Sequence, residues 1–306
     1  MRDIQLPYGI KDDKLVHISE VESGLVCKCN CPSCHAELIA KKGPDTIYHF
    51  AHHSAESCEH ALETVLHLAA KDILTATDQI FLPEVIVEFS SGFRKIELAE
   101  SKAYQIDSVL VEKKIGNIIP DLILDIDGHQ LLVEVFVTHG VDEEKLRRIR
   151  ELGISAIEID LSSVPRDLPM RVLSDLIVSG LENKKWLNNE RVNSTYSELM
   201  LKAALIKIEK LTDKRLNPYD VSYVRGVNRC PEMMRRVEKN DSSIGVEAEF
   251  CCYCKYCLVI EPKSAGPAIM ESIYCVGHNP AALGGYKLCP PYYLYGAKML
   301  GDWSSY

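Results

Sequence analysis

The chain has 306 residues, a length that accommodates two domains and a small metal-binding module. Its 44 Asp and Glu residues outnumber its 35 Lys and Arg residues, and the net charge of −9 argues against a protein that binds nucleic acid indiscriminately. No apolar run approaches the length needed to span a bilayer, and the polar segment 1–7 lacks the apolar core of a secretory signal, so we expect a soluble, cytoplasmic protein.

The first feature along the chain is a group of closely spaced cysteine and histidine residues. In the reducing cytoplasm such a group indicates metal ligands before it indicates disulfides. Cys31 and Cys34 are separated by two residues, and after fourteen intervening residues His49 and His52 repeat this spacing. Four such ligands suit tetrahedral zinc, so we predict a structural zinc site here. Other thiols and imidazoles of the segment are competing or spare ligands, namely Cys27, Cys29, His53 and Cys58.

A helix is predicted over residues 60–77, because apolar side chains recur there at helical spacing. Glu63, His67 and Lys71 follow one another every four residues, so they form one polar stripe on this helix. The stripe places an acid, an imidazole and an ammonium group where they can serve one site.

The most informative segment runs from residue 119 to 137 and is typical of a β-hairpin. With Asp127-Gly128 as a two-residue turn, the register places Asp121 directly opposite Glu134. Two like charges at opposed positions destabilise a sheet, so the arrangement needs a reason. A magnesium or manganese ion between them supplies one, since such ions prefer oxygen ligands and can activate water for attack on phosphate. The hairpin therefore indicates a nuclease-like site.

The other hairpin positions separate into two faces. An apolar set would fill a core and leave both carboxylates on the opposite face; it comprises Leu122, Leu124, Ile126, Val133 and Val135. Each acid also has a plainer interpretation, because Pro-Asp at a strand start is often a turn and Glu in a strand is often solvated. The register and the polar helical stripe together favour the metal site.

The elements around the hairpin set the fold class. Strands are predicted at 85–89 and 104–112 before it, and a helix at 142–152 and a strand at 154–161 after it. The order helix, strands, helix, strand predicts the α/β class with a mixed sheet.

These residues resemble a known superfamily. Pro120-Asp121 followed by Glu134-Val135-Phe136 resembles the PD-(D/E)XK nucleases, and the resemblance implies an αβββαβ core whose acidic pair binds catalytic metal. The chain is similar in more detail to the competence-protein CoiA-like family, over about residues 27–162. The elements that carry this likeness are Cys31-x-x-Cys34, His49-Phe-Ala-His52, the helix with Glu63, His67 and Lys71, and the acidic pair.

The superfamily pattern has a lysine two residues after the second acid, where this chain has Phe136. A phenyl ring can neither position water nor stabilise developing charge, so either the site is inactive or another lysine takes the role. We assign this role to Lys145, because it lies on the first turns of the next helix. Glu63 is assigned as a third catalytic acid that contributes to metal binding. Side chains that could bind phosphate or shape the pocket are His67, Lys71, Thr138 and His139.

A second group of cysteines lies in the last quarter of the chain. Cys254 and Cys257 are followed, after seventeen residues, by Cys275 and His278, which is the spacing of a zinc ribbon. We therefore predict a second structural zinc site, which brings the zinc content to two ions per chain. Alternative ligands are Cys251 and Cys289.

The predicted organisation has three parts. They are a zinc-finger-like module at residues 1–58, a nuclease-like domain at 59–180, and a helical linker with a C-terminal zinc-ribbon-like domain at 181–306. Residues 184–241 hold 13 Lys or Arg and 8 Asp or Glu, so nucleic acid is expected to bind there. A solvated helix face over 199–211 is the alternative.

Three functions fit this sequence. The leading one is a magnesium-dependent endonuclease that hydrolyses phosphodiester bonds in DNA, for DNA uptake or recombination. The second is a nuclease-like protein that binds DNA without cleaving it, which the phenylalanine at position 136 would explain. The third is an anti-phage effector whose C-terminal part senses the trigger.

Overall fold

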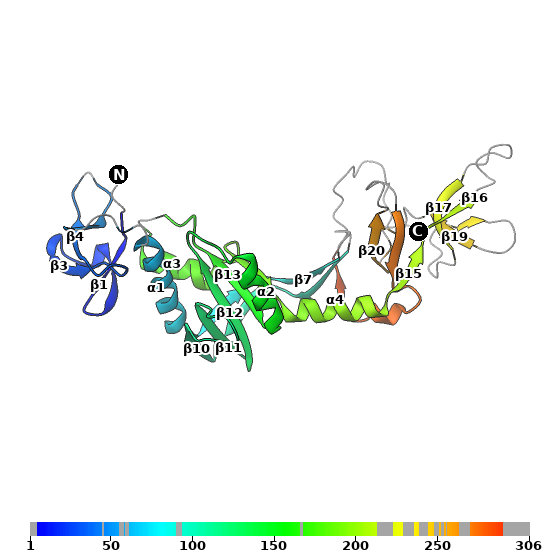
Figure 1. Cartoon of the computed structure of the whole chain (residues 1–306), viewed down its shortest axis with the longest axis horizontal. Helices are drawn as coiled ribbons and strands as arrows, with labels where there is room; N and C mark the ends of the chain where they lie inside the picture. The colour runs from blue at the N-terminus through cyan, green and yellow to red at the C-terminus, as the bar shows by residue number, and fades with distance from the viewer. Residues whose placement is uncertain are drawn as a thin grey trace. The chain divides into compact units, whose positions relative to one another are not determined.

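The structure is a computed structural model that describes residues 5–44, 46–54, 58, 61–89, 94–165, 168–212, 223–228, 236–238, 244–247, 251, 254, 256–262 and 270–289. The chain divides into two compact units (Figure 1). The first unit comprises residues 1–83 and 101–190, and the second comprises 84–100 and 191–306. Residues 84–100, which lie within the range predicted for the nuclease-like domain, belong to the second unit, where strand β8 (Lys95–Ala99) pairs with β22 (Lys287–Leu288).

The N-terminal part of the first unit is a five-stranded antiparallel sheet in the order β2-β1-β3-β4-β5. Its side chains bury a small core of their own around Leu6, Leu38 and Phe50. The strands are β1 Tyr8–Lys11, β2 Lys14–His17, β3 Gly24–Asn30, β4 Glu37–Lys41 and β5 His49–His52, with the short helix η1 Ile18–Glu20 after β2.

The rest of the first unit is a mixed sheet in the order β10-β11-β12-β13-β14, in which only β12 and β13 run parallel. This confirms the α/β class and the mixed sheet expected from the sequence. The elements are α1 Ala61–Ala76, β10 Ser108–Val111, β11 Leu122–Ile126, β12 His129–Phe136, α2 Glu143–Leu152, β13 Ser155–Asp160, α3 Met170–Ser179 and β14 Lys184–Asn188. A separate pair consists of β6 Gln79–Leu82 and β9 Lys102–Gln105.

The central hairpin has the predicted turn and register. Asp127 and Gly128 both have positive φ, at 52° and 75°, as a type I′ turn requires. Pairing then runs from Ile126 with His129 to Leu122 with Val133. Two-residue turns of this type match the twist of the strands, which is why this short sequence fixes the pairing.

Helices cover both faces of the mixed sheet (Figure 1). The predicted apolar face of the hairpin packs with α1 and α3, where Leu122 and Val133 share a core with Val65 and Leu173. The opposite face is covered by α2, through Ile149 against Leu132. Both faces of β12 are therefore buried, which removes the acidic residue of this strand from water.

The second unit contains three small sheets, ordered β22-β8-β7, β15-β21-β20 and β16-β17-β19-β18. The helix considered over residues 199–211 extends only to Lys202, where α4 ends, and two strands follow. β-branched and aliphatic residues in this stretch pair with partners far along the chain. The elements are β7 Val85–Glu88, β8 Lys95–Ala99, α4 Glu190–Lys202, β15 Ala204–Lys207, β16 Glu209–Thr212, β17 Tyr223–Asn228, β18 Arg236–Glu238, β19 Ile244–Glu247, β20 Cys257–Pro262, β21 Met270–Cys275, η2 Pro280–Leu283 and β22 Lys287–Leu288.

Among the helices that the structure describes, none combines the length and the apolar character needed to cross a membrane.

Candidate functional site

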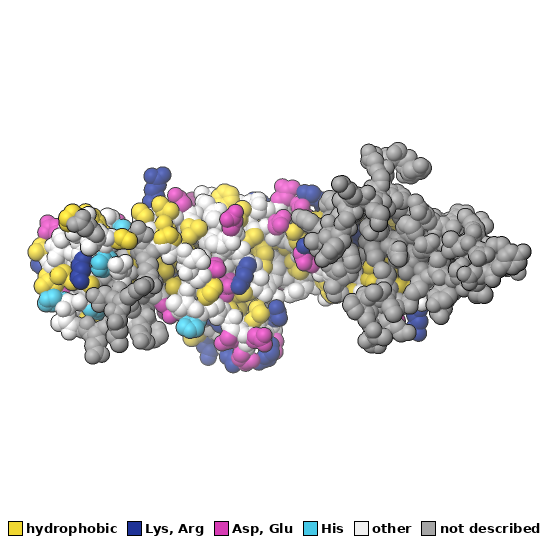
Figure 2. Space-filling model, turned by 90° about the horizontal axis from the view of Figure 1, so that it is seen from above, with side chains coloured by type: hydrophobic (Ala, Val, Ile, Leu, Met, Phe, Trp, Pro, Cys, Tyr) yellow, Lys and Arg dark blue, Asp and Glu magenta, His cyan; other side chains and the backbone are white. Residues whose placement is uncertain are grey.

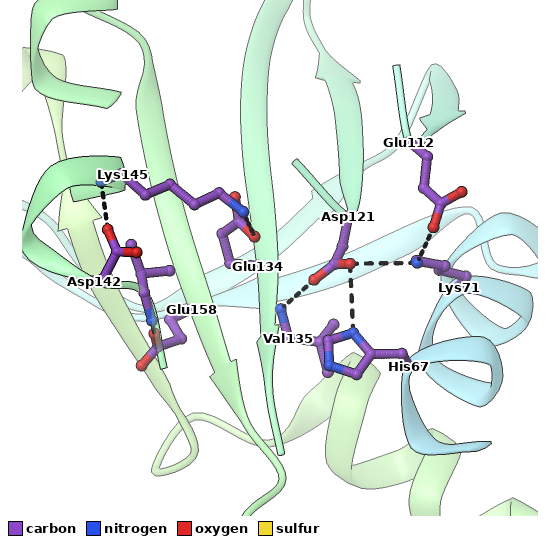
Figure 3. Close-up of polar contacts among 10 residues, drawn as sticks. His67, Lys71, Glu112, Asp121, Glu134, Val135, Asp142, Lys145 and Glu158 are labelled. Atoms are coloured by element: carbon purple, nitrogen blue, oxygen red, sulfur yellow. Dashed lines mark hydrogen bonds and ion pairs between the residues drawn. The ribbon is translucent and has the colours of Figure 1, made fainter. Parts of the chain in front are cut away.

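The two acids singled out from the sequence lie on neighbouring strands of the hairpin. Asp121 immediately precedes the first paired residue of β11, and Glu134 follows its partner on β12. Side chains from α1 reach Asp121, and Lys145 reaches Glu134 from α2 (Figure 3). The structure thus brings both acids, the polar stripe of α1 and the proposed lysine to one end of the hairpin.

Asp121 is held as a carboxylate by several donors. Its Oδ2 accepts a hydrogen bond from the Val135 N–H at 2.9 Å. Its Oδ1 lies 3.4 Å from His67 Nδ1 and 3.3 Å from Lys71 Nζ. Burial by itself raises the pKa of Asp121, but the bonds from His67 and Val135 and the nearby positive charges outweigh it and lower the pKa to about 2. Asp121 is therefore ionised at neutral pH.

Glu134, on the neighbouring strand, has a different environment from Asp121. It is only 4% exposed, and its Oε2 lies 2.7 Å from Lys145 Nζ. Its Oε1 is buried and has no hydrogen-bond partner within the described part of the chain. Burial raises the pKa of Glu134 to about 7 and the Asp121 carboxylate adds to the rise, although Lys145 opposes it. A buried acceptor without a donor is costly, so a cation beside it would stabilise the fold.

The raised pKa of Glu134 predicts how stability depends on pH. Between its ordinary value of 4.5 and about 7, the folded protein keeps a proton on Glu134 that the unfolded chain has lost. The contribution of Glu134 to the free energy of unfolding should therefore fall as pH rises through this range, by at most about 1.4 kcal/mol per pH unit. Glu134→Gln cannot ionise and should lack this fall.

Urea denaturation of both proteins at pH 5 and pH 8, without added divalent cation, measures the effect. We expect Glu134→Gln to gain stability relative to the native sequence as pH rises. If the two proteins differ in free energy of unfolding by the same amount at pH 5 and at pH 8, Glu134 is not a buried group with a raised pKa.

Lys145 lies on the first turn of α2 and its side chain points to Glu134. Asp142 is the N-cap of α2, and its Oδ1 accepts a hydrogen bond from the Lys145 N–H at 2.7 Å. The cap fixes the first turn of the helix, from which the Lys145 side chain extends to Glu134. Phe136 lies two residues beyond Glu134 and is partly buried. An ammonium group thus lies beside Glu134, and it comes from α2 and not from β12, where Phe136 stands at the position of the usual lysine.

Other predicted site residues lie nearby with different contacts. The Glu63 carboxylate lies 3.9 Å from His139 Nδ1, and its predicted place as a third metal ligand stays a prediction. Among the residues described, no group of three acids and histidines at this end of the sheet brings its ligand atoms within 4.8 Å of one another. Thr138 Oγ1 and His139 Nδ1 lie 2.9 Å apart.

Two acids of this region were missed by the sequence reasoning. Glu112 has a positive φ of 48° and its carboxylate accepts a hydrogen bond from Lys71 Nζ at 2.7 Å. Glu158 lies in β13 and is only 2% exposed. A glutamate inside the apolar strand run Ala156–Ile159 was the available signal for Glu158, because such a residue is rarely buried without a partner.

The N-terminal sheet contains a candidate metal centre. Cys31, Cys34, His52 and Cys58 each offer one ligand atom, and these four atoms lie within 4.8 Å of one another. Cys34 Sγ lies 3.3 Å from His52 Nε2. Three thiols and one imidazole form a donor set that suits tetrahedral zinc. Burial opposes ionisation of Cys34, but hydrogen bonds from the Ala36 N–H and the neighbouring thiols lower its pKa, which favours the thiolate that binds metal.

The predicted ligand His49 is wrong, and Cys58 takes its place. His49 and His52 are three residues apart on the same strand, so their side chains point to opposite faces of the sheet. The His49 ring instead donates to the Ile47 carbonyl, with Nδ1 and O 2.7 Å apart. On the other side of the centre, a tight turn between β3 and β4 brings Cys31 and Cys34 together, closed by the hydrogen bond from His35 N to Cys31 O.

The second predicted zinc site is not assembled within the described residues. Cys254, Cys257 and Cys275 are buried, but His278 is exposed in a turn beyond the end of β21. No group of three or more ligand atoms close together is found there among the residues described. The three cysteines instead contribute to the apolar core of the second unit, and Arg94 donates to the carbonyl oxygens of Cys254 and Cys257.

The sequence was compared with known proteins. Residues 17–61 match the family model described as the N-terminal domain of the competence protein CoiA. This match supports a CoiA-like family. The CoiA-like segment spans β3, β4 and β5 and contains all four members of the Cys/His centre, whereas the acidic pair lies outside it. No curated protein and no solved structure gives a significant match to the chain.

Proposed function

We propose that the mixed sheet of the first unit carries a metal-dependent nuclease site that hydrolyses phosphodiester bonds in DNA. The observation that carries the proposal is the acidic pair Asp121 and Glu134 with Lys145 Nζ 2.7 Å from Glu134. Apart from β6 to β9, which come between α1 and β10 in the chain, the order α1, β10, β11, β12, α2, β13 also fits the αβββαβ core of the PD-(D/E)XK nucleases. DNA is the proposed substrate because the N-terminal segment is similar to a competence protein.

The residues fit a magnesium or manganese ion. Asp121 is ionised at neutral pH, and Glu134 presents a buried oxygen that lacks a donor. Asp121 and Glu134 would hold the ion, which when bound supplies an activated water and Lewis-acid stabilisation of phosphoryl oxygens. His67 and Lys71 keep Asp121 charged through their contacts with its Oδ1. Lys145 contributes a positive charge that can stabilise the negative charge developing on the phosphate.

On the face drawn in Figure 2, the described acidic and basic side chains are interspersed. On α2, for example, Arg147 and Arg148 pair with Glu144. The basic segment 184–241 remains the proposed contact region, although Arg229, Arg235 and Lys239 lie outside the described residues. Binding through such a segment should weaken with salt.

A cleavage assay with and without magnesium on single-stranded DNA, double-stranded DNA and RNA tests the proposal. We expect DNA to be cut only when magnesium or manganese is present. Absence of cleavage on all substrates, with DNA binding retained, would favour the alternative of a non-cleaving DNA-binding protein. The phenylalanine in place of the usual lysine is the observation that favours this alternative.

Lys145→Ala tests the lysine directly. A charge that acts on the transition state should change the turnover rate more than the affinity for DNA. We therefore expect cleavage to slow by roughly a hundredfold, with nearly unchanged binding. Arg148→Ala is the matched control, because Arg148 lies on the same helix, is exposed and pairs with Glu144 rather than with the acidic pair. Full-speed cleavage by Lys145→Ala would remove the lysine from the mechanism.

A further inference from the structure

Glu158 is a buried carboxylate that the proposed metal site does not use. It lies on β13 between two charged neighbours, because the register pairs it with Glu134 on β12 and with Lys185 on β14. Only 2% of its surface is exposed. A glutamate in the middle of a sheet that is covered on both faces must have strong partners to remain there.

Both oxygens of Glu158 lie beside a partner, but only Oε2 accepts a hydrogen bond among the described residues, whereas Oε1 forms an ion pair. Oε1 lies 2.6 Å from Lys185 Nζ, and the side chain of Lys185 is largely exposed to solvent. Oε2 accepts a hydrogen bond from the Val141 N–H at 3.1 Å. Val141 lies in the connection between β12 and α2, so Glu158 ties this connection to the neighbouring strand.

A short path of contacts continues from Val141 to the acidic pair. The next residue, Asp142, caps α2 and receives the Lys145 N–H. Lys145 then extends its ammonium group to Glu134 (Figure 3). The start of α2 is therefore fixed at two successive residues, first by a carboxylate from the sheet and then by its own cap. The position of the helix along its axis decides whether Lys145 can reach Glu134, because one residue shifts a side chain by about 1.5 Å and 100° around the helix.

We propose that Glu158 is a positioning residue, which holds the start of α2 through Val141 and so places Lys145 against Glu134. The inference rests on the proposed nuclease function for its catalytic readout. It gives the buried carboxylate a role: the Val141 N–H, in the connection just before the N-cap of α2, needs an acceptor, and a charged acceptor binds it more strongly than a neutral one.

The test is a double-mutant cycle on cleavage rate under saturating DNA. Glu158→Ala removes the acceptor and should slow cleavage at least roughly tenfold, since small displacements of a catalytic group have such effects. Glu158→Gln keeps an oxygen that Val141 can reach and should restore most of the rate. In the Lys145→Ala background, Glu158→Ala should have little further effect, because the group that it positions is already absent. Effects of the two changes that multiply, or full-speed cleavage by Glu158→Ala, would overturn the proposal.

Hydrogen exchange gives a readout that does not depend on activity. In Glu158→Ala the peptide that spans residues 137–146 should exchange faster, while Glu158→Gln should resemble the native sequence. Unchanged exchange in Glu158→Ala would overturn the anchoring itself. If the native protein cleaves no DNA but this exchange pattern is found, the nuclease proposal fails and the anchoring of α2 by Glu158 stands.

Discussion

Asp121→Ala and Glu134→Ala should each reduce magnesium-dependent DNA cleavage by about a thousandfold or more, since several kcal/mol of metal-derived stabilisation would be lost. Each substitution removes one of the two carboxylates that would hold the ion. The fold should survive both changes, because the hairpin is held by its type I′ turn and by apolar cores on both faces of the sheet. Single-turnover cleavage at several magnesium concentrations measures the effect.

The two variants should differ in stability when no magnesium is added. Glu134→Ala removes a buried oxygen without a donor, whereas Asp121→Ala removes the acceptor for Val135, His67 and Lys71. We therefore expect Asp121→Ala to be the less stable of the two in thermal melts at pH 8. Asp125→Asn is the matched control on the same strand, because its side chain can still accept the Gly128 N–H. Cleavage unaffected by both alanine substitutions would exclude the acidic pair as a metal site.

Purified protein should contain one zinc ion per chain at the centre formed by Cys31, Cys34, His52 and Cys58. Cys34→Ser and Cys58→Ser should each lose the zinc and unfold the N-terminal sheet, because structural zinc in small modules contributes about 10 kcal/mol or more of binding free energy. The core of this sheet is small, so it has little other stabilisation. Metal analysis and hydrogen exchange over residues 17–61 measure the loss.

His49→Ala provides the contrast for these cysteine variants. His49 lies next to the centre in sequence but bonds to the Ile47 carbonyl, so its loss should leave the zinc content unchanged. Loss of zinc in His49→Ala with retention in Cys58→Ser would show that the sequence spacing, and not the geometry of the structure, identifies the ligands. A zinc content near zero in the reduced, folded protein would exclude the centre.

The amino-acid sequence by itself determined the features that depend on local geometry. Asp127-Gly128 specifies a type I′ turn, and a two-residue turn leaves one register for the strands, so the placement of Asp121 beside Glu134 followed from the sequence. The first turn of α2 was also local, because Asp142 at the cap and two acids after it favour a helix start there. The absence of a lysine at position 136 then made Lys145 a specific prediction; its Nζ lies 2.7 Å from Glu134 Oε2, and its catalytic role stays a prediction.

Only the tertiary structure decided the features that join distant segments. The spacing of His49 and His52 matched a zinc motif, but the alternation of side chains along β5 leaves only His52 facing the cysteines, and Cys58 completes the set. His278 matched a zinc ribbon by spacing, yet a turn carries its ring into solvent. Glu158 gained its partners from the connection that precedes α2 and from β14, which lie before and after it in the chain. The spacing of residues along a sequence does not show which distant segments become neighbours of a side chain, or which face of a strand the side chain occupies once the sheet has formed. Both determine which residues can bind a metal ion together and which charged residues are buried.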